Sequence, residues 1–297
     1  MEVFLSQYFN AIVIVWIGLA ILLFPLLLKV RAPYGRHTAG RWGPRLDNRL
    51  GWFIMELPSL ILITSLFFAG RDPGWNVLWI FWALWFIHYF NRIFIYPFRT
   101  RTKGKKIPLL VVLLAMFFNL VNGFLNGYWL GYIAGSREQG AGITSGADLS
   151  QTAGADLSQT AGADLSQTAG ADLQIRASNG DYHLLNPHFI IGLALFLTGF
   201  IINQVSDNHL LHLRNGRKKG YSIPTHPLFK YVSCPNFAGE ILEWTGFAIM
   251  TWSLPGLSFA IWTAVNLIPR ALHHHAWYKE TFPDYPKKRK ALIPYIL

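Results

Sequence analysis

The sequence predicts an all-α integral membrane protein, a bundle of seven transmembrane helices with its N-terminus outside and its C-terminus in the cytosol. Three observations lead to this fold class. Of the 297 residues, 52% are hydrophobic and only 14% are charged, more apolar than a soluble domain of this length can bury. Apolar runs long enough to cross about 30 Å of hydrocarbon recur along the chain. Basic residues gather in alternate loops between these runs.

Seven apolar segments are expected to span the membrane, each close to the length that a helix rising about 1.5 Å per residue needs. They cover residues 8–28, 51–69, 77–97, 108–134, 187–205, 237–254 and 256–271. The first run has no basic region before it and no A-x-A-like cleavage site after it, so we interpret it as a retained span rather than a signal peptide.

The charges of the loops set the predicted orientation. Residues 29–50 and 270–290 carry six lysines and arginines each, and residues 97–107 and 208–230 carry five each. The alternate loops and the N-terminus carry only Arg71, Arg137 and Arg176. Because lysine and arginine concentrate in cytoplasmic loops, the four basic segments and the C-terminus are expected on the cytosolic side. A soluble anionic cofactor would bind from that side.

An internal repeat separates the fourth and fifth spans. The octapeptide GADLSQTA occurs three times over residues 146–169, and a partial GADL follows at 170–173. The repeat has too little apolar surface to form a self-supporting coil. We expect residues 136–181 to form a flexible external loop, dispensable for chemistry, within a single membrane domain over residues 1–297.

Several classes of site are absent from the sequence. The basic residues do not lie along polar helices with interleaved aromatics, which argues against nucleic acid as a partner. The lone Cys234 excludes an internal disulfide, and no zinc spacing, Rossmann fingerprint or P-loop is present. Histidines 273–275 are consecutive, so on a helix they point about 100° apart and cannot share one ion. No metal is expected.

Span two contains the most informative polar residue, Glu56. A carboxylate at membrane depth is costly unless it is paired, hydrogen-bonded or protonated. A neutral Glu56 could donate a hydrogen bond to a carbonyl oxygen and so polarise an enone, with Tyr89 of span three as a second donor. The alternative is a structural ion pair between Glu56 and Arg92.

Polar side chains also share helical faces toward the predicted cytosolic end, at spacings of three, four or seven residues. These residues are Arg270, His274 and Tyr278 after span seven, Asn236, Glu240 and Glu243 at span six, and Asn203, Asp207 and Arg214 at the end of span five. Such faces do not contact lipid, so they form either a binding site or hydrogen bonds between helices.

The chain resembles the steroid 5α-reductase family of membrane NADPH-dependent enone reductases, and it looks like a bacterial-type homologue. The resemblance covers nearly all of the chain outside the repeat. It is carried by PYGRHT (33–38), WFIMELPS (52–59), IHYFNRIFIYP (87–97), NGFLNGYWLGY (122–132), IINQVSDNHLLHLR (201–214), residues 220–255 with NFAGEILEW and TWSLP, and RALHHHAWYKETFPDYPKKRKALIPYIL (270–297).

The resemblance implies an activity and residue roles. The expected reaction is NADPH-dependent reduction of the Δ4 double bond of 3-oxo-Δ4 steroids to 5α-3-oxosteroids. The resemblance assigns Glu56 and Tyr89 to the substrate's 3-oxo group and Trp52 to the wall of the steroid pocket. The positions that it assigns to NADPH are Tyr34, Tyr96, Lys105, Asn203, Asp207, Arg214, Tyr221, Asn236, Glu240, Arg270, His274 and Tyr278.

Alternative functions stay open on the sequence. A related sterol or trans-2-enoyl-CoA reductase would also use NADPH. An isoprenylcysteine methyltransferase-like enzyme and a non-enzymatic sterol-binding membrane protein are further alternatives. The expected partners are a steroid-like substrate from the membrane, NADPH from the cytosol, and membrane lipid. A bacterial inner membrane and the endoplasmic reticulum membrane suit the sequence equally.

Overall fold

The computed structural model describes residues 2–31, 42–70, 76–100, 102, 104–134, 184–215 and 221–297, and at 2–4, 6, 214 and 215 it describes the backbone only. The whole of the loop expected at 136–181, with its octapeptide repeat, and Tyr34 lie outside the described residues. The loop and the single-domain organisation therefore stay predictions.

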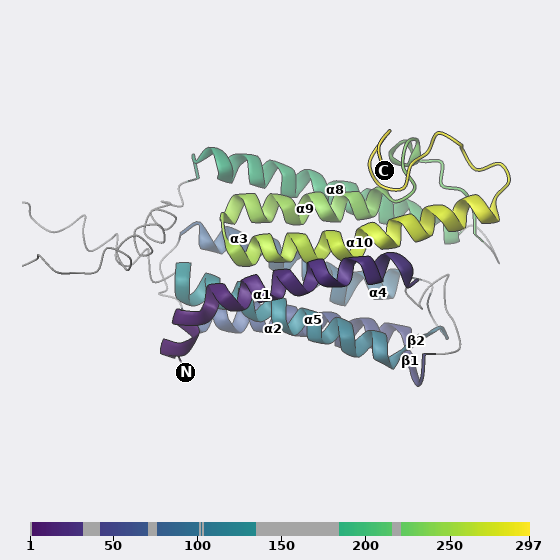
Figure 1. Ribbon diagram of the computed structural model, residues 1–297. Helices are drawn as coiled ribbons and strands as arrows, with labels where there is room; N and C mark the ends of the chain where they lie inside the picture. Colours follow the sequence, from purple (N-terminus) through teal and green to yellow (C-terminus); the bar gives the residue numbers. More distant parts are fainter. Residues whose placement is uncertain are drawn as a thin grey trace, which may run out of the picture.

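The described chain forms an elongated bundle of helices that lie side by side (Figure 1). The helices are α1 (Glu2–Lys29), α2 (Asn48–Gly70), α3 (Leu78–Phe90), the π-helix η2 (Asn91–Ile95), α4 (Tyr96–Arg99), α5 (Leu109–Tyr128), the π-helix η3 (Trp129–Ala134), α8 (Pro187–Asn215), the 3₁₀ helix η4 (Pro227–Phe229), α9 (Pro235–Thr251) and α10 (Leu254–Thr281). Short strands β1 (Arg45–Asp47) and β2 (Lys106–Pro108) pair antiparallel, a feature that the all-α prediction did not include. The N-terminus and the C-terminal segment lie at opposite ends of the bundle (Figure 1).

Five helical segments among the described residues are long and apolar enough to cross a membrane. They are Gln7–Lys29, Asn48–Gly70, Leu78–Arg99, Leu109–Ala134 and Pro187–Leu213, and they match the first five predicted spans. The last two predicted spans fall in α9 and α10, which are not among the five. α9 has only 17 residues and carries two glutamates, whereas Asn266 and Arg270 make α10 more polar. The described chain is thus mostly helical, with five apolar helices long enough to span a membrane, as expected of a helical membrane protein.

Two predicted spans end earlier than the helices do. α8 continues past residue 205 to Asn215, and α10 continues past residue 271 to Thr281. Asn203 and Asp207 therefore lie on one uninterrupted helix, and the RALHHHAWY segment is helical, as its four-residue spacing predicted. Hydropathy marks the apolar part of a helix, and these helices extend beyond it because polar residues also adopt helical structure.

Glycines allow α8 and α9 to pack very closely. Gly192 and Gly199 of α8 face Gly246 and Gly239 of α9, and a Cβ atom added to Gly239 would lie 2.6 Å from the backbone nitrogen of Asn203. The same device joins α2 and α5, where a Cβ on Gly127 would lie 2.9 Å from the Cα of Ile63. Small residues at helix interfaces in membranes let backbones approach and gain dispersion energy. The close approach brings the polar residues of α8 and α9 within hydrogen-bonding reach.

Substituting Gly199 with alanine is expected to destabilise the bundle by about 1–3 kcal/mol, because the added methyl group would collide with the backbone nitrogen of Glu243. The matched control is Gly18→Ala in α1, where no described atom lies within 4 Å of the added Cβ. That change should stabilise the protein by about 0.5–1 kcal/mol through helix propensity. Unfolding in detergent with increasing denaturant would measure both, and equal effects would contradict the packing account.

Aromatic side chains pack the other helices against α9 and α10. Trp16 of α1 packs against Trp262 of α10 with tilted rings and a centroid distance of 4.5 Å. The indole nitrogen of Trp16 donates to the amide oxygen of Asn122 of α5. The indole nitrogen of Trp262 donates to the backbone oxygen of Trp16 at 3.1 Å. In the centre, Trp85 of α3 is fully buried against Trp244 of α9, with ring centroids 4.8 Å apart. These contacts join α1, α3 and α5 to the α9–α10 pair.

The C-terminal segment folds back onto the residues that precede α9. The Ser233 hydroxyl lies 2.6 Å from Nδ1 of His275 and 2.6 Å from the Tyr285 hydroxyl, and it donates to the Lys290 carbonyl. The Ser233 backbone nitrogen also donates to that carbonyl at 2.8 Å. Ser233 therefore fastens the C-terminal segment to the end of α10.

This fastening should weaken in mild acid. Burial, and then the positive charges of Lys279, Lys290 and Arg289, lower the pKa of His275 below its ordinary value. The unfolded chain then binds more protons than the folded one, so the stabilisation is present above about pH 6.5 and is lost as the pH falls below it. Limited proteolysis of the C-terminal segment across this range should show faster cleavage in acid, and His275→Gln should remove that pH dependence. Equal cleavage at all pH values in the wild type would contradict the assignment.

Candidate active site

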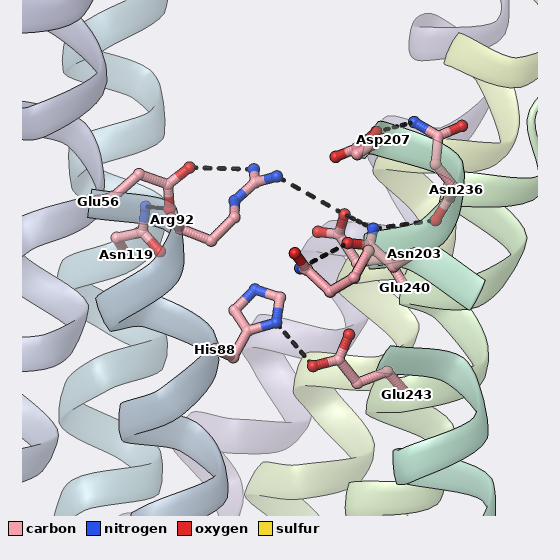
Figure 2. A network of polar contacts seen from close by, with 10 residues as sticks. Glu56, His88, Arg92, Asn119, Asn203, Asp207, Asn236, Glu240 and Glu243 are labelled. Atoms are coloured by element: carbon pink, nitrogen blue, oxygen red, sulfur yellow. Dashed lines mark hydrogen bonds and ion pairs between the residues drawn. The ribbon is translucent and has the colours of Figure 1, made fainter. Parts of the chain in front are cut away.

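The centre of the bundle contains a continuous network of polar side chains (Figure 2). Arg92 of η2 lies in its middle: one guanidinium nitrogen donates to Glu56 of α2 at 3.2 Å, and the other lies 3.8 Å from a carboxylate oxygen of Glu240 of α9. All three side chains are largely buried. Because buried charges are costly unless they are paired, this arginine stabilises both carboxylates at once.

On the α2 side, Asn119 of α5 connects the two residues that were predicted to contact a carbonyl group. The Tyr89 hydroxyl donates to the amide oxygen of Asn119 at 2.9 Å. The amide nitrogen of Asn119 donates to the Met55 carbonyl at 2.7 Å and lies 3.4 Å from Glu56 Oε2. Glu56 and Tyr89 thus meet through one amide, with Glu56 in the ion pair with Arg92 that the sequence left open as the alternative.

Two aromatic rings contact the arginine. The Arg92 guanidinium lies 4.8 Å from the ring centroid of Trp52 and 5.8 Å from that of Tyr96, and the two rings are 5.5 Å apart. Cation–π contacts hold a guanidinium in one orientation while shielding it from lipid. Tyr96, predicted with the cofactor residues, therefore lies beside Trp52, which was predicted to contact the substrate.

On the opposite side, α8 and α9 present the predicted amide and carboxylate face. The Asn203 amide donates to the Asn236 carbonyl at 3.1 Å and to Glu240 Oε2 at 3.3 Å. The Asn236 amide donates to Asp207 at 3.0 Å. Two residues of α8 and two of α9 thus share one hydrogen-bonded cluster, and Glu240 connects that cluster to Arg92.

The α10 face adjoins this cluster through α9. His274 packs against Phe237, with a centroid distance of 5.7 Å, and Tyr278 is buried and stacks on Tyr285 at 5.3 Å. Arg270 lies one turn before His274 and is half-buried. Tyr221 contacts Trp277, next to Tyr278, at 5.0 Å.

The three consecutive histidines diverge, which confirms the helical argument. Nε2 of His273 lies 3.0 Å from the Leu28 carbonyl of α1, whereas His274 meets α9 and His275 meets Ser233. Each ring therefore contacts a different part of the bundle.

A second polar contact crosses the bundle one turn deeper than Arg92. Nδ1 of His88 lies 2.7 Å from Oε1 of Glu243, and both side chains are almost fully buried. His88 and Glu243 are separated by 155 residues in sequence. The sequence predicted Glu243 on a polar face, but it gave no signal that Glu243 would meet His88 of span three.

Three further predicted cofactor residues differ in what the structure describes of them. Tyr34 lies outside the described residues, and of Arg214 only the backbone at the end of α8 is described. The Lys105 side chain is exposed, while its backbone carbonyl accepts from Asn48 at the start of α2. Arg92 was expected only as the structural partner of Glu56 in the alternative interpretation, and Asn119 was not predicted at the site, although both are central to it. The signal that could have found them was available, because ionisable and amide residues within an apolar span mark functional sites.

The donor set suits the binding of a nucleotide beside a ketone. Hydrogen-bond donors and acceptors from α8 and α9 lie at the same end of the bundle as the cationic and aromatic face of α10, the combination that phosphates and a carboxamide require. Arg92, Tyr89 and Asn119 supply donors where a carbonyl oxygen could replace a protein acceptor. The residues present therefore fit a dinucleotide.

Comparisons with known proteins show the family of the chain. The family model described as 3-oxo-5-alpha-steroid 4-dehydrogenase matches residues 171–297. The chain is 34% identical to steroid 5-alpha-reductase DET2 of Arabidopsis thaliana over 91% of this chain and 90% of the relative. It is 34% identical to 3-oxo-5-alpha-steroid 4-dehydrogenase 1 of Bos taurus over 94% and 93%, and 33% identical to that of Homo sapiens over 90% and 87%. The chain therefore belongs to the steroid 5α-reductase family, and it is an oxidoreductase of steroid metabolism.

Proposed function

We propose that this protein reduces the Δ4 double bond of 3-oxo-Δ4 steroids with NADPH and yields 5α-3-oxosteroids. The observation that carries the proposal is the bridge made by Arg92, which joins Glu56, assigned by resemblance to the substrate ketone, to Glu240, assigned to the cofactor. A reductase needs these two sites side by side, because hydride passes directly between cofactor and substrate.

NADPH would be held by the amide and carboxylate cluster of α8 and α9 and by the face of α10. The residues involved are Asn203, Asp207, Asn236, Glu240, Arg270, His274 and Tyr278, with Tyr221 at the edge. Bound there, NADPH supplies the hydride that the β-carbon of the enone receives. The remaining chemistry is the stabilisation of charge and the supply of a proton, and both fall to the protein.

The substrate ketone would lie between Tyr89, Glu56 and Arg92. The Tyr89 hydroxyl would donate to the ketone oxygen in place of Asn119. Glu56 would donate when it carries a proton, and the guanidinium of Arg92 would face the negative charge that develops on that oxygen. Preorganised donors of this kind lower the barrier because they need no reorganisation during the reaction. Trp52, beside Arg92, would form part of the steroid wall.

The proposed topology has seven spans, with α9 and α10 crossing the membrane beside α8 and α1. The N-terminus is then outside, and the cofactor is met from the cytosol. The opposite placement of the two ends of the chain supports this topology, as do the basic segments near β1, β2 and the C-terminal end (Figure 1). Cysteine labelling of residues introduced near each terminus, in sealed vesicles, would test the orientation.

The activity is tested with purified protein in lipid nanodiscs. NADPH oxidation should depend on testosterone or progesterone, and mass spectrometry should identify the 5α-reduced ketone. NADPH carrying deuterium on the transferred position should place the label on the β-carbon. If NADPH is oxidised with a trans-2-enoyl-CoA but with neither steroid, the protein is instead an enoyl reductase related to this family. No oxidation with any of these substrates would overturn the proposal.

A further inference from the structure

The His88–Glu243 pair is buried beside the site and has no role in the function proposed above. His88 is 4% exposed and Glu243 is 0% exposed, and Nδ1 and Oε1 are 2.7 Å apart. Aromatic rings surround the pair: Trp244 lies 4.7 Å and Tyr89 lies 5.3 Å from the imidazole, centroid to centroid. A dry environment of this kind keeps a proton from exchanging freely with water.

The second oxygen of Glu243, Oε2, is buried without any hydrogen-bond partner among the described residues. An ionised carboxylate would leave charge on that bare oxygen, whereas a carboxylic acid would leave only a carbonyl oxygen there, which is far less costly to bury. The geometry therefore favours a proton on Oε1 that is donated to Nδ1 of His88. The other imidazole nitrogen, Nε2, then carries a hydrogen of its own.

The charges around the pair favour keeping this proton. Among the residues labelled in Figure 2, the carboxyl groups are Glu56 on α2, Asp207 on α8, and Glu240 and Glu243 on α9, whereas Arg92 on η2 is the permanent cation. Figure 2 places Glu240, Arg92 and Glu56 around the pair, and the neighbouring titratable group on the helix of His88 is the Tyr89 phenol. A surplus of carboxyl groups over cations stabilises a bound proton.

The second nitrogen of the His88 imidazole faces away from Glu243. In Figure 2 the ring nitrogen that does not face Glu243 points away from it and toward Arg92. A carboxyl group that holds one nitrogen of a histidine, with the other nitrogen presented to a reaction site, is the arrangement that positions a proton donor or acceptor.

We propose that the His88–Glu243 pair stores the proton that completes the reduction and delivers it toward the substrate's α-carbon. The inference rests on the proposed function, in which hydride arrives at the β-carbon and an enolate remains. The Nε2–H bond breaks as the α-carbon–hydrogen bond forms. Oε1 of Glu243 passes its proton to Nδ1, so the pair ends as a neutral histidine and a glutamate carboxylate. A proton from water recharges the pair before the next turnover.

The test compares His88→Gln and Glu243→Gln with the control His188→Gln, which lies near Trp252 at the opposite end of α8 from Asp207. Wild-type turnover with NADPH and testosterone tests the proposed function, and the ratio of variant to wild type tests this inference. Each site variant should lower kcat by about 100-fold or more, the usual range for a lost proton donor. The affinities for NADPH and steroid should stay unchanged, as should the melting temperature. The control should match the wild type.

Two readouts separate proton storage from a structural role. The residual kcat of His88→Gln should rise about tenfold for each unit by which the pH falls, because solvent must then supply the proton. Independently of activity, the infrared spectrum of the wild type should contain the carbonyl band of a buried carboxylic acid that Glu243→Gln lacks. The inference is overturned if that band is absent, if His88→Gln turns over like the wild type, or if its loss is independent of pH and accompanied by weaker binding of both ligands.

Discussion

Glu56→Gln is expected to lower kcat with a 3-oxo-Δ4 steroid by about 100- to 1000-fold, corresponding to the roughly 2.7–4 kcal/mol that one lost oxyanion donor costs. The side-chain amide is a far weaker acid than a carboxylic acid, so it stabilises an enolate oxygen less well. In its ionised state Glu56 also pairs with Arg92, whose guanidinium lies 3.2 Å away, and the amide cannot make that ion pair. Steady-state kinetics with product identification would measure the loss.

NADPH binding should be largely unaffected by this substitution, because Glu56 lies on the side of Arg92 away from the α8–α9 cluster. Fluorescence of the tryptophans on NADPH addition would check this. A matched control is Glu280→Gln, since Glu280 is exposed and forms a surface pair with Arg31 at 3.6 Å. Exposed pairs contribute about 0–1 kcal/mol, so this control should retain full activity. Wild-type turnover in Glu56→Gln would overturn the assigned role.

Arg92→Met is expected to have an even broader effect, abolishing activity and destabilising the protein by about 3 kcal/mol. The substitution removes the cation from between Glu56 and Glu240, and breaking a buried ion pair by removing one partner leaves an uncompensated charge. The contacts of the guanidinium with Trp52 and Tyr96 are lost as well. Thermal unfolding in detergent, followed alongside turnover, would measure both losses.

A compensated variant separates the two effects of Arg92. In the triple variant Arg92→Met, Glu56→Gln, Glu240→Gln, both carboxylates are replaced by neutral amides, so most of the stability should return while activity stays absent. If the single variant is as stable as the wild type, the ion pairs are not what holds α2 and α9 in place around the site. If the triple variant is active, charge at this position is not needed for the reaction.

The sequence was sufficient wherever a feature depended on neighbouring residues along one helix. The four-residue spacing of Arg270, His274 and Tyr278 correctly placed them on one helix, and the same rule separated the three histidines. The first five spans followed from length and hydropathy, because lipid selects long apolar helices. Family membership followed from motifs distributed over nearly the whole chain.

The sequence did not determine which faces of the helices contact one another. Glu56 had two plausible states on the sequence, a neutral acid or a partner of Arg92, and the structure contains the ion pair. The role of Asn119 as a bridge between Tyr89 and Glu56 was also not predicted. Helical periodicity states which residues share a face but not which face of another helix it meets.

The sequence alone therefore determined the class of protein, the spans of highest hydropathy and the residues that line each polar face, because these depend on composition and local spacing. Only the tertiary structure decided that Arg92 joins Glu56 to Glu240 and that His88 meets Glu243, since these partners are brought together by packing. Glycines at 192, 199, 239 and 246 allow α8 to pack closely against α9. The aromatic core around Trp85 packs α3 against α9. These close approaches bring separate polar faces together into one site. They depend on complementary shapes of segments that are distant in sequence.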